Sequence, residues 1–330
     1  MLLNKIDQVK TTISALCRQP GKIAILTHSF PDGDGLPACV ALKHILRSQG
    51  FKSDIVLEAK APAALEFLNI SEQVLIYDEE MEFATVFIVD CHEAHRTGKT
   101  AVLAEKARSV MAIDHHQQQN LQKNWYYCIK TEVVSAGAII LMAYQHDLMR
   151  LAPKERKYIG DCFYTTILND TGGFVNSNTD ADVFRLCAQI AKLGTDPAEV
   201  MEDFVLSNPP IQLRFTGQVL SSIELSSEGQ VLFMHSSLAL IEQNGLDSEA
   251  TSNITRWVKG AQGVKVTIYA REQENGIYRL SLRSTNVNCN KICSSFDGGG
   301  HINAAGCSIT GSLDEVRRTI LAQVESALNE

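Results

Sequence analysis

Short apolar runs alternate with helical patterns along the N-terminal part of the chain. Runs of this kind are typical of strands that are buried on both faces of a parallel sheet. Between them, apolar residues recur with helical spacing, and Gly50 and Gly194 follow two of these segments, as glycine commonly does at a helix end. The alternation predicts an α/β fold with a doubly wound, mostly parallel sheet. The predicted strands are Lys22–Thr27, Ser53–Leu57, Gln73–Tyr77, Thr85–Asp90 and Ser109–Asp114, and the predicted helices are Gly35–Gln49, Thr131–His146, Lys154–Leu168 and Ala181–Leu193.

A break at Ser207-Asn208-Pro209-Pro210 divides the chain. Ile211–Leu225 then has helical spacing and is expected to form a connector. After it the pattern restarts with β-rich runs, and the Asn275-Gly276 pair between two of them is a strong hairpin signal. We therefore predict three parts, at 1–206, 207–226 and 227–330, with a smaller α/β domain at the C-terminal end and an active site in the cleft between the domains. The predicted strands of this second domain are Gln230–Met234, Val264–Ala270 and Tyr278–Arg283, and a last helix starts near Leu313.

The composition is that of an ordinary globular protein, with 45% hydrophobic and 21% charged residues. Near the start, Leu3, Ile6, Val9, Ile13 and Leu16 share one helical face, but intervening polar residues exclude a secretory signal. The longest apolar run, Ala136–Tyr144, is too short to span a bilayer, so no membrane association is expected. Nine cysteines without a CxxC pair indicate reduced thiols, and a cytoplasmic location is expected.

The net charge of −8 bears on the class of ligand. Proteins that follow long nucleic acids usually present a basic surface, since their affinity comes from neutralised phosphates. The longest basic run here is Arg317-Arg318, and aromatic residues make up only 7% of the chain. A small phosphorylated ligand is therefore favoured over a long nucleic acid. Bound divalent cations would supply the positive charge that the composition lacks.

Acids and histidines follow four apolar segments. Ser109–Ile113 leads into Asp114-His115-His116, and three further segments lead into His28 to Asp34, Asp90, and Asn169-Asp170. Because the carboxyl ends of parallel strands meet at one edge of a sheet, these side chains are expected to gather there. Imidazole and carboxylate ligands together suit Mn²⁺, Fe²⁺, Zn²⁺ or Mg²⁺, and a pair of such ions can clamp both oxygens of a phosphoryl transfer.

Each segment taken alone has a structural explanation. Asp32-Gly33-Asp34-Gly35 is commonly a turn, and Asn169-Asp170 can begin a loop. His115 and His116 can be a surface or capping pair, and Asp90 can cap a helix. Cys39 and Cys91 lie close in sequence to these residues, but packing is the favoured role for them. The conjunction of all four segments is what favours a metal cluster.

In these motifs the chain resembles the DHH phosphoesterase superfamily. Thr27 to Gly35 is similar to the first motif of that family, and Asp90, Asp114-His115-His116 and Asn169 to Gly172 are similar to the second, third and fourth. Near the C-terminus, Phe296 to Gly306 resembles the glycine-rich signature of the DHH-associated C-terminal domain. The layout is most similar to stand-alone members of the nanoRNase and pAp-phosphatase kind, which are related to RecJ.

The resemblance implies a role for each site residue. One ion would be held by His28, Asp32 and Asp90, and the other by Asp34, Asp90, His115 and Asp170, so that Asp90 bridges. Asp114 would orient a ligand histidine, and His116 would face the substrate. The expected cofactors are two divalent metal ions, Mn²⁺ first, with Mg²⁺, Fe²⁺ or Co²⁺ as alternatives. The substrate contacts implied for the second domain are Arg283, Gly298, Gly299, Gly300 and His301.

The implied reaction is hydrolysis of very short 5′-phosphorylated RNA, such as the dinucleotides pGpG or pApA, to mononucleotides. This activity would clear the products of cyclic-dinucleotide (c-di-GMP) signalling and of RNA degradation. A pAp (3′-phosphate) phosphatase, a cyclic-dinucleotide phosphodiesterase and a non-catalytic nucleotide-binding regulator stay open as alternatives, and a family II pyrophosphatase is disfavoured by the glycine signature. The sequence leaves open whether the chain forms a homodimer.

Three departures from the family pattern concern substrate choice rather than the metal ligands. Leu36-Pro37-Ala38 follows the first motif, where many relatives have small residues. Val134 to Gly137 replaces a segment rich in serine and threonine. Asp297 stands where many relatives have a further glycine, and its charge beside a phosphate would be repulsive.

Overall fold

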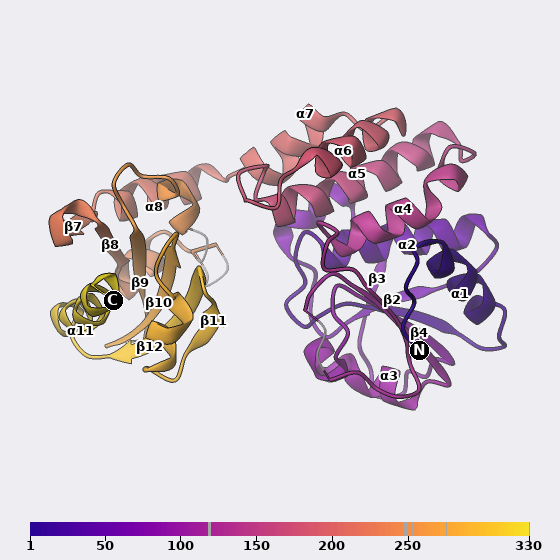
Figure 1. The fold of residues 1–330 in the computed structure, drawn as a ribbon, viewed down its shortest axis with the longest axis horizontal. Coiled ribbons are helices and arrows are strands. Elements are labelled where there is room, and N and C mark those ends of the chain that lie inside the picture. Colours follow the sequence, from indigo (N-terminus) through magenta and orange to yellow (C-terminus); the bar gives the residue numbers. More distant parts are fainter. Residues whose placement is uncertain (118–119, 247–249, 252–253, 275, 330) are drawn as a thin grey trace. The chain divides into compact units, whose positions relative to one another are not determined.

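The computed structural model describes residues 1–117, 120–246, 250–251, 254–274 and 276–329. The chain divides into two compact units, Met1–Ser207 and Asn208–Glu330. Each unit has its own six-stranded sheet (Figure 1). The predicted fold class, an α/β domain with a parallel sheet and a second, smaller α/β domain, is confirmed.

The sheet of the N-terminal unit is parallel throughout, in the order β3-β2-β1-β4-β5-β6. The strand order reverses between the neighbours β1 and β4, so the loops that follow these two strands lead to opposite faces of the sheet. In open α/β sheets, ligands bind at such a reversal point. The five predicted strands are present and a sixth, β6, was not predicted. The strands are β1 (Ile23–Leu26), β2 (Asp54–Leu57), β3 (Val74–Ile76), β4 (Thr85–Val89), β5 (Ser109–Asp114) and β6 (Tyr126–Ile129).

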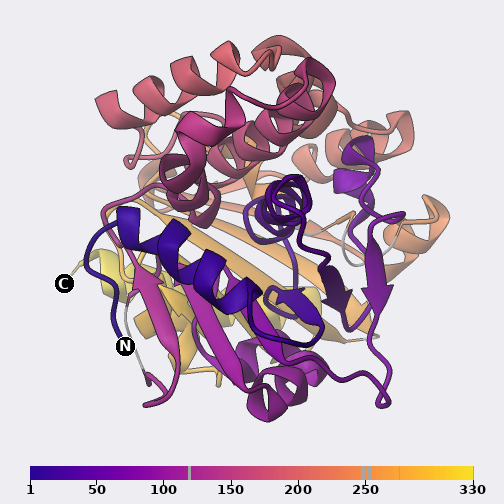
Figure 2. The same cartoon turned by 90° about the vertical axis from the view of Figure 1, so that its right-hand side faces the viewer.

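Helices cover both faces of this sheet (Figure 2). In β4, Phe87 and Val89 pack into the larger core with α1, α2, α4 and α5, whereas Val86 and Ile88 face α3. Burial on both faces explains why the strands read as continuous apolar runs. The helices of this unit are α1 (Asp7–Cys17), α2 (Gly35–Ser48), α3 (Ala101–Lys106), α4 (Ala136–Leu148), α5 (Pro153–Thr171), α6 (Ala181–Lys192) and α7 (Pro197–Met201), with short 3₁₀ or π segments at Ala63–Leu68, Ala94–Thr100 and Glu202–Leu206.

Two helix boundaries differ from the sequence prediction in ways that matter for the site. The helix predicted from Thr131 begins at Ala136, because the Ser135 side chain accepts a hydrogen bond from the Ala138 N–H and caps it. The helix predicted to end at Leu168 continues through Thr171 and ends at Gly172, which has a left-handed conformation. Asp170 therefore lies in the last turn of a helix and not at the end of a strand.

The C-terminal unit has a mixed sheet in the order β11-β12-β10-β9-β8-β7, in which β8 and β9 are parallel and the other neighbours are antiparallel. One face packs on α10 and α11, and the other packs on α8 and α9. The expected connector helix is α8, whose Phe215 and Val219 are buried in this unit. Strands β9 and β10 are antiparallel neighbours as predicted, although Asn275 of the expected turn lies outside the described residues. The elements are α8 (Pro210–Leu220), β7 (Glu224–Ser226), β8 (Val231–Ser236), α9 (Leu238–Gln243), β9 (Val266–Glu274), β10 (Ile277–Ser284), α10 (Cys289–Ser294), β11 (Gly299–His301), β12 (Ala304–Thr310) and α11 (Leu313–Leu328), with 3₁₀ segments at Ser227–Gly229 and Ile254–Val258.

Within the described part of the chain, no helix is both long enough and apolar enough to cross a bilayer.

Candidate metal centre

The loop after β1 folds around the carboxylate of Asp32. Its Oδ1 accepts hydrogen bonds from the backbone N–H groups of Asp34 and Gly35, at 3.0 and 3.1 Å. Its Oδ2 accepts a hydrogen bond of 3.1 Å from the Asn169 side chain in α5. The bond from Asn169 connects the first motif with the fourth. The bonds from Asp34 and Gly35 hold the backbone at the point where α2 begins.

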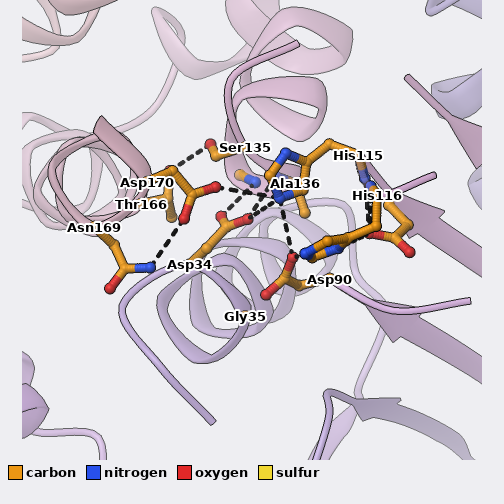
Figure 3. Close-up of polar contacts among 12 residues, drawn as sticks. Asp34, Gly35, Asp90, His115, His116, Ser135, Ala136, Thr166, Asn169 and Asp170 are labelled. Atoms are coloured by element: carbon orange, nitrogen blue, oxygen red, sulfur yellow. Dashed lines mark hydrogen bonds and ion pairs between the residues drawn. The ribbon is translucent and has the colours of Figure 1, made fainter. Parts of the chain in front are cut away.

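Asp34 is fully buried and links two helices. Its two carboxylate oxygens accept hydrogen bonds from the backbone N–H groups of Ala136 and Gly137, at 2.7 and 3.0 Å (Figure 3). These donors lie in the first turn of α4, where N–H groups lack intrahelical partners and a negative charge is favoured. The segment Val134 to Gly137, which departs from the family pattern, thus contributes backbone donors that fix Asp34.

Asp90 follows β4 with a φ of 66°, a left-handed conformation that is uncommon for a residue other than glycine. Its Oδ2 lies 3.3 Å from Nε2 of His28, and its Oδ1 lies 3.4 Å from Nε2 of His115. Gly35 allows this approach, since a Cβ there would lie 2.1 Å from Oγ1 of Thr27 and 3.3 Å from Oδ2 of Asp90. The carboxylate therefore faces a different histidine with each oxygen, as a bridging ligand would.

His115 occupies the centre of the cluster (Figure 3). Its Nε2 lies 3.2 Å from Oδ2 of Asp170 and 3.7 Å from Oδ2 of Asp34, in addition to its contact with Asp90. Donor atoms within 4.8 Å of one another form three overlapping groups: His28, Asp32 and Asp90; Asp34, His115 and Asp170; and Asp90, Asp114, His115 and His116. The structure thus brings all six residues predicted as metal ligands into one place.

The electrostatics of the first group favour a charged histidine in the absence of a metal. Burial lowers the pKa of His28, but hydrogen bonds to Asp32 and Asp90 and the charges of both acids outweigh it and raise that pKa to about 9. Burial raises the pKa of Asp32, but the contact with His28 and the backbone N–H groups of Gly35 and Asp34 lower it to about 2. A cation is therefore favoured at this position, whether it is a proton on His28 or a metal ion.

The second group crowds carboxylates together. Burial, followed by the charges of Asp90 and Asp170, raises the pKa of Asp34 well above its usual range. Burial raises the pKa of Asp170 to about 7, with His115 acting against the shift and Asp90 adding to it. Among the described residues, Oδ1 of Asp90 and Oδ2 of Asp170 are buried atoms without a hydrogen-bond partner. Both oxygens lie close to Nε2 of His115, and carboxylate oxygens that gather at one imidazole without hydrogen-bond donors are suited to a divalent cation, so the residues present fit metal ions.

A further acid orders the histidines beside the cluster. Asp114, at the end of β5, is buried, and its Oδ1 accepts hydrogen bonds from the backbone N–H groups of His115 and His116, at 2.7 and 3.1 Å. The same oxygen lies 2.8 Å from Nδ1 of His116, and Oδ2 contacts Nδ1 of His92. The resemblance implied that Asp114 orients a ligand histidine, whereas the rings that Asp114 contacts belong to His116 and His92. His92 was missed, although its position two residues after Asp90 is a signal that it lies near the same strand end.

The cysteines near the site have the packing role that was favoured. Cys39 and Cys91 are buried in the two cores of the N-terminal unit, and burial raises the pKa of each thiol.

The substrate residues predicted in the second domain lie together on neighbouring strands. Arg283 is an exposed residue of β10, and its guanidinium donates to the Leu282 carbonyl at 2.9 Å. Its register partner in β12 is Ala304, which also pairs with His301 of β11, so Arg283 and His301 flank the same strand.

The glycines of the signature do not share one structural role. A Cβ on Gly298 would lie 2.4 Å from the Gly306 carbonyl, and one on Gly300 would lie 2.5 Å from the Ala304 carbonyl, so both are required by packing against β12. A Cβ on Gly299 would approach nothing closer than 3.8 Å, so packing does not require glycine there. Asp297 has a φ of 54°, a left-handed conformation that glycine would adopt without strain.

Comparisons with known proteins agree with this geometry. Residues 22–167 match the sequence model of the DHH family, N-terminal domain, and residues 230–330 match that of the DHHA1 domain. A Thermus thermophilus protein named "Bifunctional oligoribonuclease and PAP phosphatase NrnA" is 29% identical, over 98% of this chain and 95% of its own. The Bacillus subtilis protein of the same name is 24% identical, over 93% of this chain and 95% of its own. The crystal structure of an exopolyphosphatase-related protein from Bacteroides fragilis has the same fold, with a TM-score of 0.83 at 21% identity, covering 97% of this chain and 95% of that one.

Proposed function

Because the chain belongs to the DHH family and is a hydrolase of phosphodiester bonds, we propose that it cleaves very short 5′-phosphorylated RNA into mononucleotides. The proposed substrates are dinucleotides such as pGpG or pApA. The observation that carries the proposal is the arrangement around Asp90, whose two oxygens face His28 on one side and His115 on the other. The names of the relatives in Thermus and Bacillus support the choice of a short RNA.

We assign two divalent ions to the donor groups. His28, Asp32 and Asp90 would hold one, and Asp34, Asp90, His115 and Asp170 would hold the other. Mn²⁺ fits the mixture of imidazole and carboxylate donors best, with Mg²⁺, Fe²⁺ or Co²⁺ as alternatives. Ions bound there would polarise phosphoryl oxygens and make a water molecule more acidic.

The protein's own groups would orient the substrate. Asp114 holds His116 through Nδ1, so Nε2 of His116 is directed elsewhere, and the side chain is 38% exposed. In its protonated form, with the hydrogen on Nδ1 donated to Asp114, His116 would donate from Nε2 to a phosphoryl oxygen or to the leaving 3′ oxygen, where negative charge develops in the transition state. In the second domain, Arg283, Gly299 and His301 would contact the terminal 5′-phosphate, since a guanidinium can grip a phosphate with two hydrogen bonds.

A second activity, removal of the 3′-phosphate of pAp, is favoured by the names of the same relatives. It would use the same donor groups. A non-catalytic regulator is disfavoured because all six predicted ligands are present and gathered. Two further possibilities concern the exact substrate: a cyclic-dinucleotide phosphodiesterase, and a role in c-di-GMP signalling through pGpG. A panel of substrates distinguishes them.

The test is to incubate the purified protein with Mn²⁺ and a panel of substrates, and to separate the products. The panel contains pGpG, pApA, oligomers of increasing length, pAp, cyclic dinucleotides and pyrophosphate. We expect turnover to be fastest on dinucleotides and to fall steeply by about five nucleotides, because added phosphates find few basic contacts. Equal rates on a dinucleotide and a 24-mer, or turnover of pyrophosphate alone, would contradict the proposal.

A further inference from the structure

A cavity of about 600 Å³ in the N-terminal unit adjoins the metal-ligand cluster. His115 belongs to both, because it lines this cavity while its Nε2 faces Asp34, Asp90 and Asp170. The other walls come from Ile6, from the segment after β6, from α4, and from α6 with the residues just before it. His115 is therefore the side chain that the cavity and the metal-ligand cluster share.

The lining of this cavity fits a nucleoside and not a second phosphate. Val134, Met142 and Leu186 provide apolar walls, and Gln145 and Gln189 provide amides. Its charged lining residues, Glu132, Asp180, Asp182 and Arg185, are mostly acidic, and Arg185 is already paired with Asp182. An apolar slot with a few amides is what a flat ring with a hydrogen-bonding edge requires, and surplus negative charge repels a phosphate.

The side-chain amide of Gln189 has a carbonyl oxygen that lacks a hydrogen-bond donor among the described residues. Its Oε1 is buried and accepts no hydrogen bond from the described part of the chain. The amide would give up no acceptor bond by turning toward the cavity, and an amino or hydroxyl group of a ligand would supply the missing donor.

We infer that this cavity holds the 3′-terminal nucleoside of a dinucleotide substrate, an inference that rests on the proposed function. In that reaction the oxygen of water bonds to phosphorus, and the bond from phosphorus to the 3′ oxygen of the first nucleotide breaks. The leaving 3′ oxygen takes a proton, and the phosphate stays on the 5′ oxygen of the second nucleoside. That second nucleoside lies on the far side of the reacting phosphate from the 5′-terminal phosphate assigned to Arg283.

The inference separates the two proposed activities. The 3′-phosphate of pAp carries no second nucleoside, so pAp leaves the cavity empty. Changes in the cavity should therefore impair cleavage of a dinucleotide and spare the removal of phosphate from pAp.

The experiment compares three substrates: pApA, the same dinucleotide without the base of its second residue, and pAp. The variants are Gln189→Leu, which keeps the side-chain size but removes the amide, and Met142→Trp, which fills the cavity. We expect kcat/KM of the wild type to be at least about tenfold lower on the abasic dinucleotide than on pApA. Both variants should lose about tenfold on pApA and stay within about twofold of the wild type on the abasic dinucleotide and on pAp. Met149→Trp, at the exposed end of the same helix and outside the cavity lining, is the matched control and should behave as the wild type.

Two results would overturn the inference: equal wild-type activity on pApA and its abasic form, or equal losses of the variants on all three substrates. Binding of adenosine, followed by ligand-observed NMR without metal, decides the matter independently of catalysis. Adenosine should bind to the wild type and to Met149→Trp but not to Met142→Trp, and an absence of binding to the wild type would count against the cavity. Adenosine binding without cleavage of any dinucleotide would refute the proposed function while supporting the nucleoside site.

Discussion

Oδ1 of the buried Asp114 carboxylate lies 2.8 Å from Nδ1 of His116. The other oxygen of that carboxylate contacts His92, so one acid holds two imidazoles. Burial raises the pKa of Asp114, but the contacts with His116 and His92 dominate and hold that pKa far below its usual range. Asp114 is therefore a permanent anion that fixes which nitrogen of His116 is left for the substrate.

His92→Gln tests this arrangement, because His92 is the buried partner of Asp114 that the motifs do not mark. Loss of its contact should let Asp114 and His116 move, and kcat should fall by about 10–100-fold, as for other residues that orient a ligand or a catalytic group. The metal content should not change, and KM should change little. His95→Gln, at an exposed position in the following 3₁₀ segment, is the matched control. Loss of bound metal in His92→Gln would show that His92 stabilises the cluster itself.

Asp90→Asn should abolish hydrolysis while the protein stays folded. Asparagine tolerates the left-handed backbone at this position, but its amide nitrogen cannot serve as a bridging ligand. We expect kcat to fall by roughly 10³-fold or more, which corresponds to about 4 kcal/mol in the activation free energy. Asp90→Ala should lose the same activity and in addition about 1–2 kcal/mol of stability from backbone strain. Near wild-type turnover of Asp90→Asn with Mn²⁺ would refute the bridging role.

Removal of metal should destabilise the protein, because Asp34, Asp90 and Asp170 then have only the nearby imidazoles to offset the repulsion between their carboxylates. Mn²⁺ at 100 times its dissociation constant should raise the free energy of unfolding by about 2.7 kcal/mol over the value in EDTA. Thermal unfolding with each addition measures this difference. The same measurement with Mg²⁺ and with Zn²⁺ ranks the metals by how much each stabilises the protein.

Asp170→Asn should raise the thermal stability of the metal-free protein at pH 8. Since the pKa of Asp170 is raised to about 7 in the fold, its charged form is the disfavoured one. That destabilisation is fully present above pH 7 and absent below the ordinary carboxyl pKa, where Asp170 is protonated in both the folded and unfolded states. The same variant should show a smaller stabilisation by Mn²⁺. A variant that is less stable than the wild type in EDTA at pH 8 would show that the contact with His115 outweighs the repulsion.

Gly298→Ala and Gly299→Ala separate structure from substrate contact in the glycine signature. The first should lose about 1–3 kcal/mol of stability, because its Cβ would overlap the Gly306 carbonyl. The second should unfold as the wild type does, because the nearest atom to its Cβ, Oδ1 of Asn290, would lie at 3.8 Å. If the signature contacts the substrate, Gly299→Ala should still raise KM for pGpG. Unchanged kinetics in Gly299→Ala would indicate that the signature is there for packing alone.

The layers, and the gathering of acids and histidines at one edge of the sheet, were predictable because both follow from local patterns, whereas the choice of six of these residues as metal ligands came from the resemblance to the DHH family. The strands are apolar on both sides, and the carboxyl end of a parallel strand is a fixed place in the fold. Asp170 was expected just beyond a helix predicted to end at Leu168, and only the hydrogen bonds of the last turn show that α5 continues through Thr171 and so carries Asp170 itself. Strand β6 was missed because it is a short edge strand whose pairing with β5 depends on tertiary contacts. His92 was missed because no spacing rule predicts that two rings share Asp114.

Arg283→Ala tests whether the N-terminal domain binds the metals and the C-terminal domain binds the terminal phosphate of the substrate. Arg283 lies on β10 of the C-terminal unit, and all the proposed metal ligands lie in the N-terminal unit. The variant should therefore bind the wild-type amount of metal. A charge-assisted hydrogen bond to a phosphate contributes roughly 1.5–3 kcal/mol, so kcat/KM on pGpG should fall by about one to two powers of ten.

The contrast between two substrates makes this test specific. Bis-p-nitrophenyl phosphate offers a phosphodiester to the metal site but has no terminal 5′-phosphate for Arg283 to bind. Its hydrolysis by Arg283→Ala should stay close to that of the wild type, and Arg318→Ala, at an exposed position in α11, should leave both substrates unaffected. Equal losses of Arg283→Ala on both substrates, or loss of bound metal, would mean that Arg283 supports the fold or the chemistry and does not hold the terminal phosphate. A loss confined to pGpG would locate the recognition of the 5′ end in the second domain, because only that substrate carries the group in question.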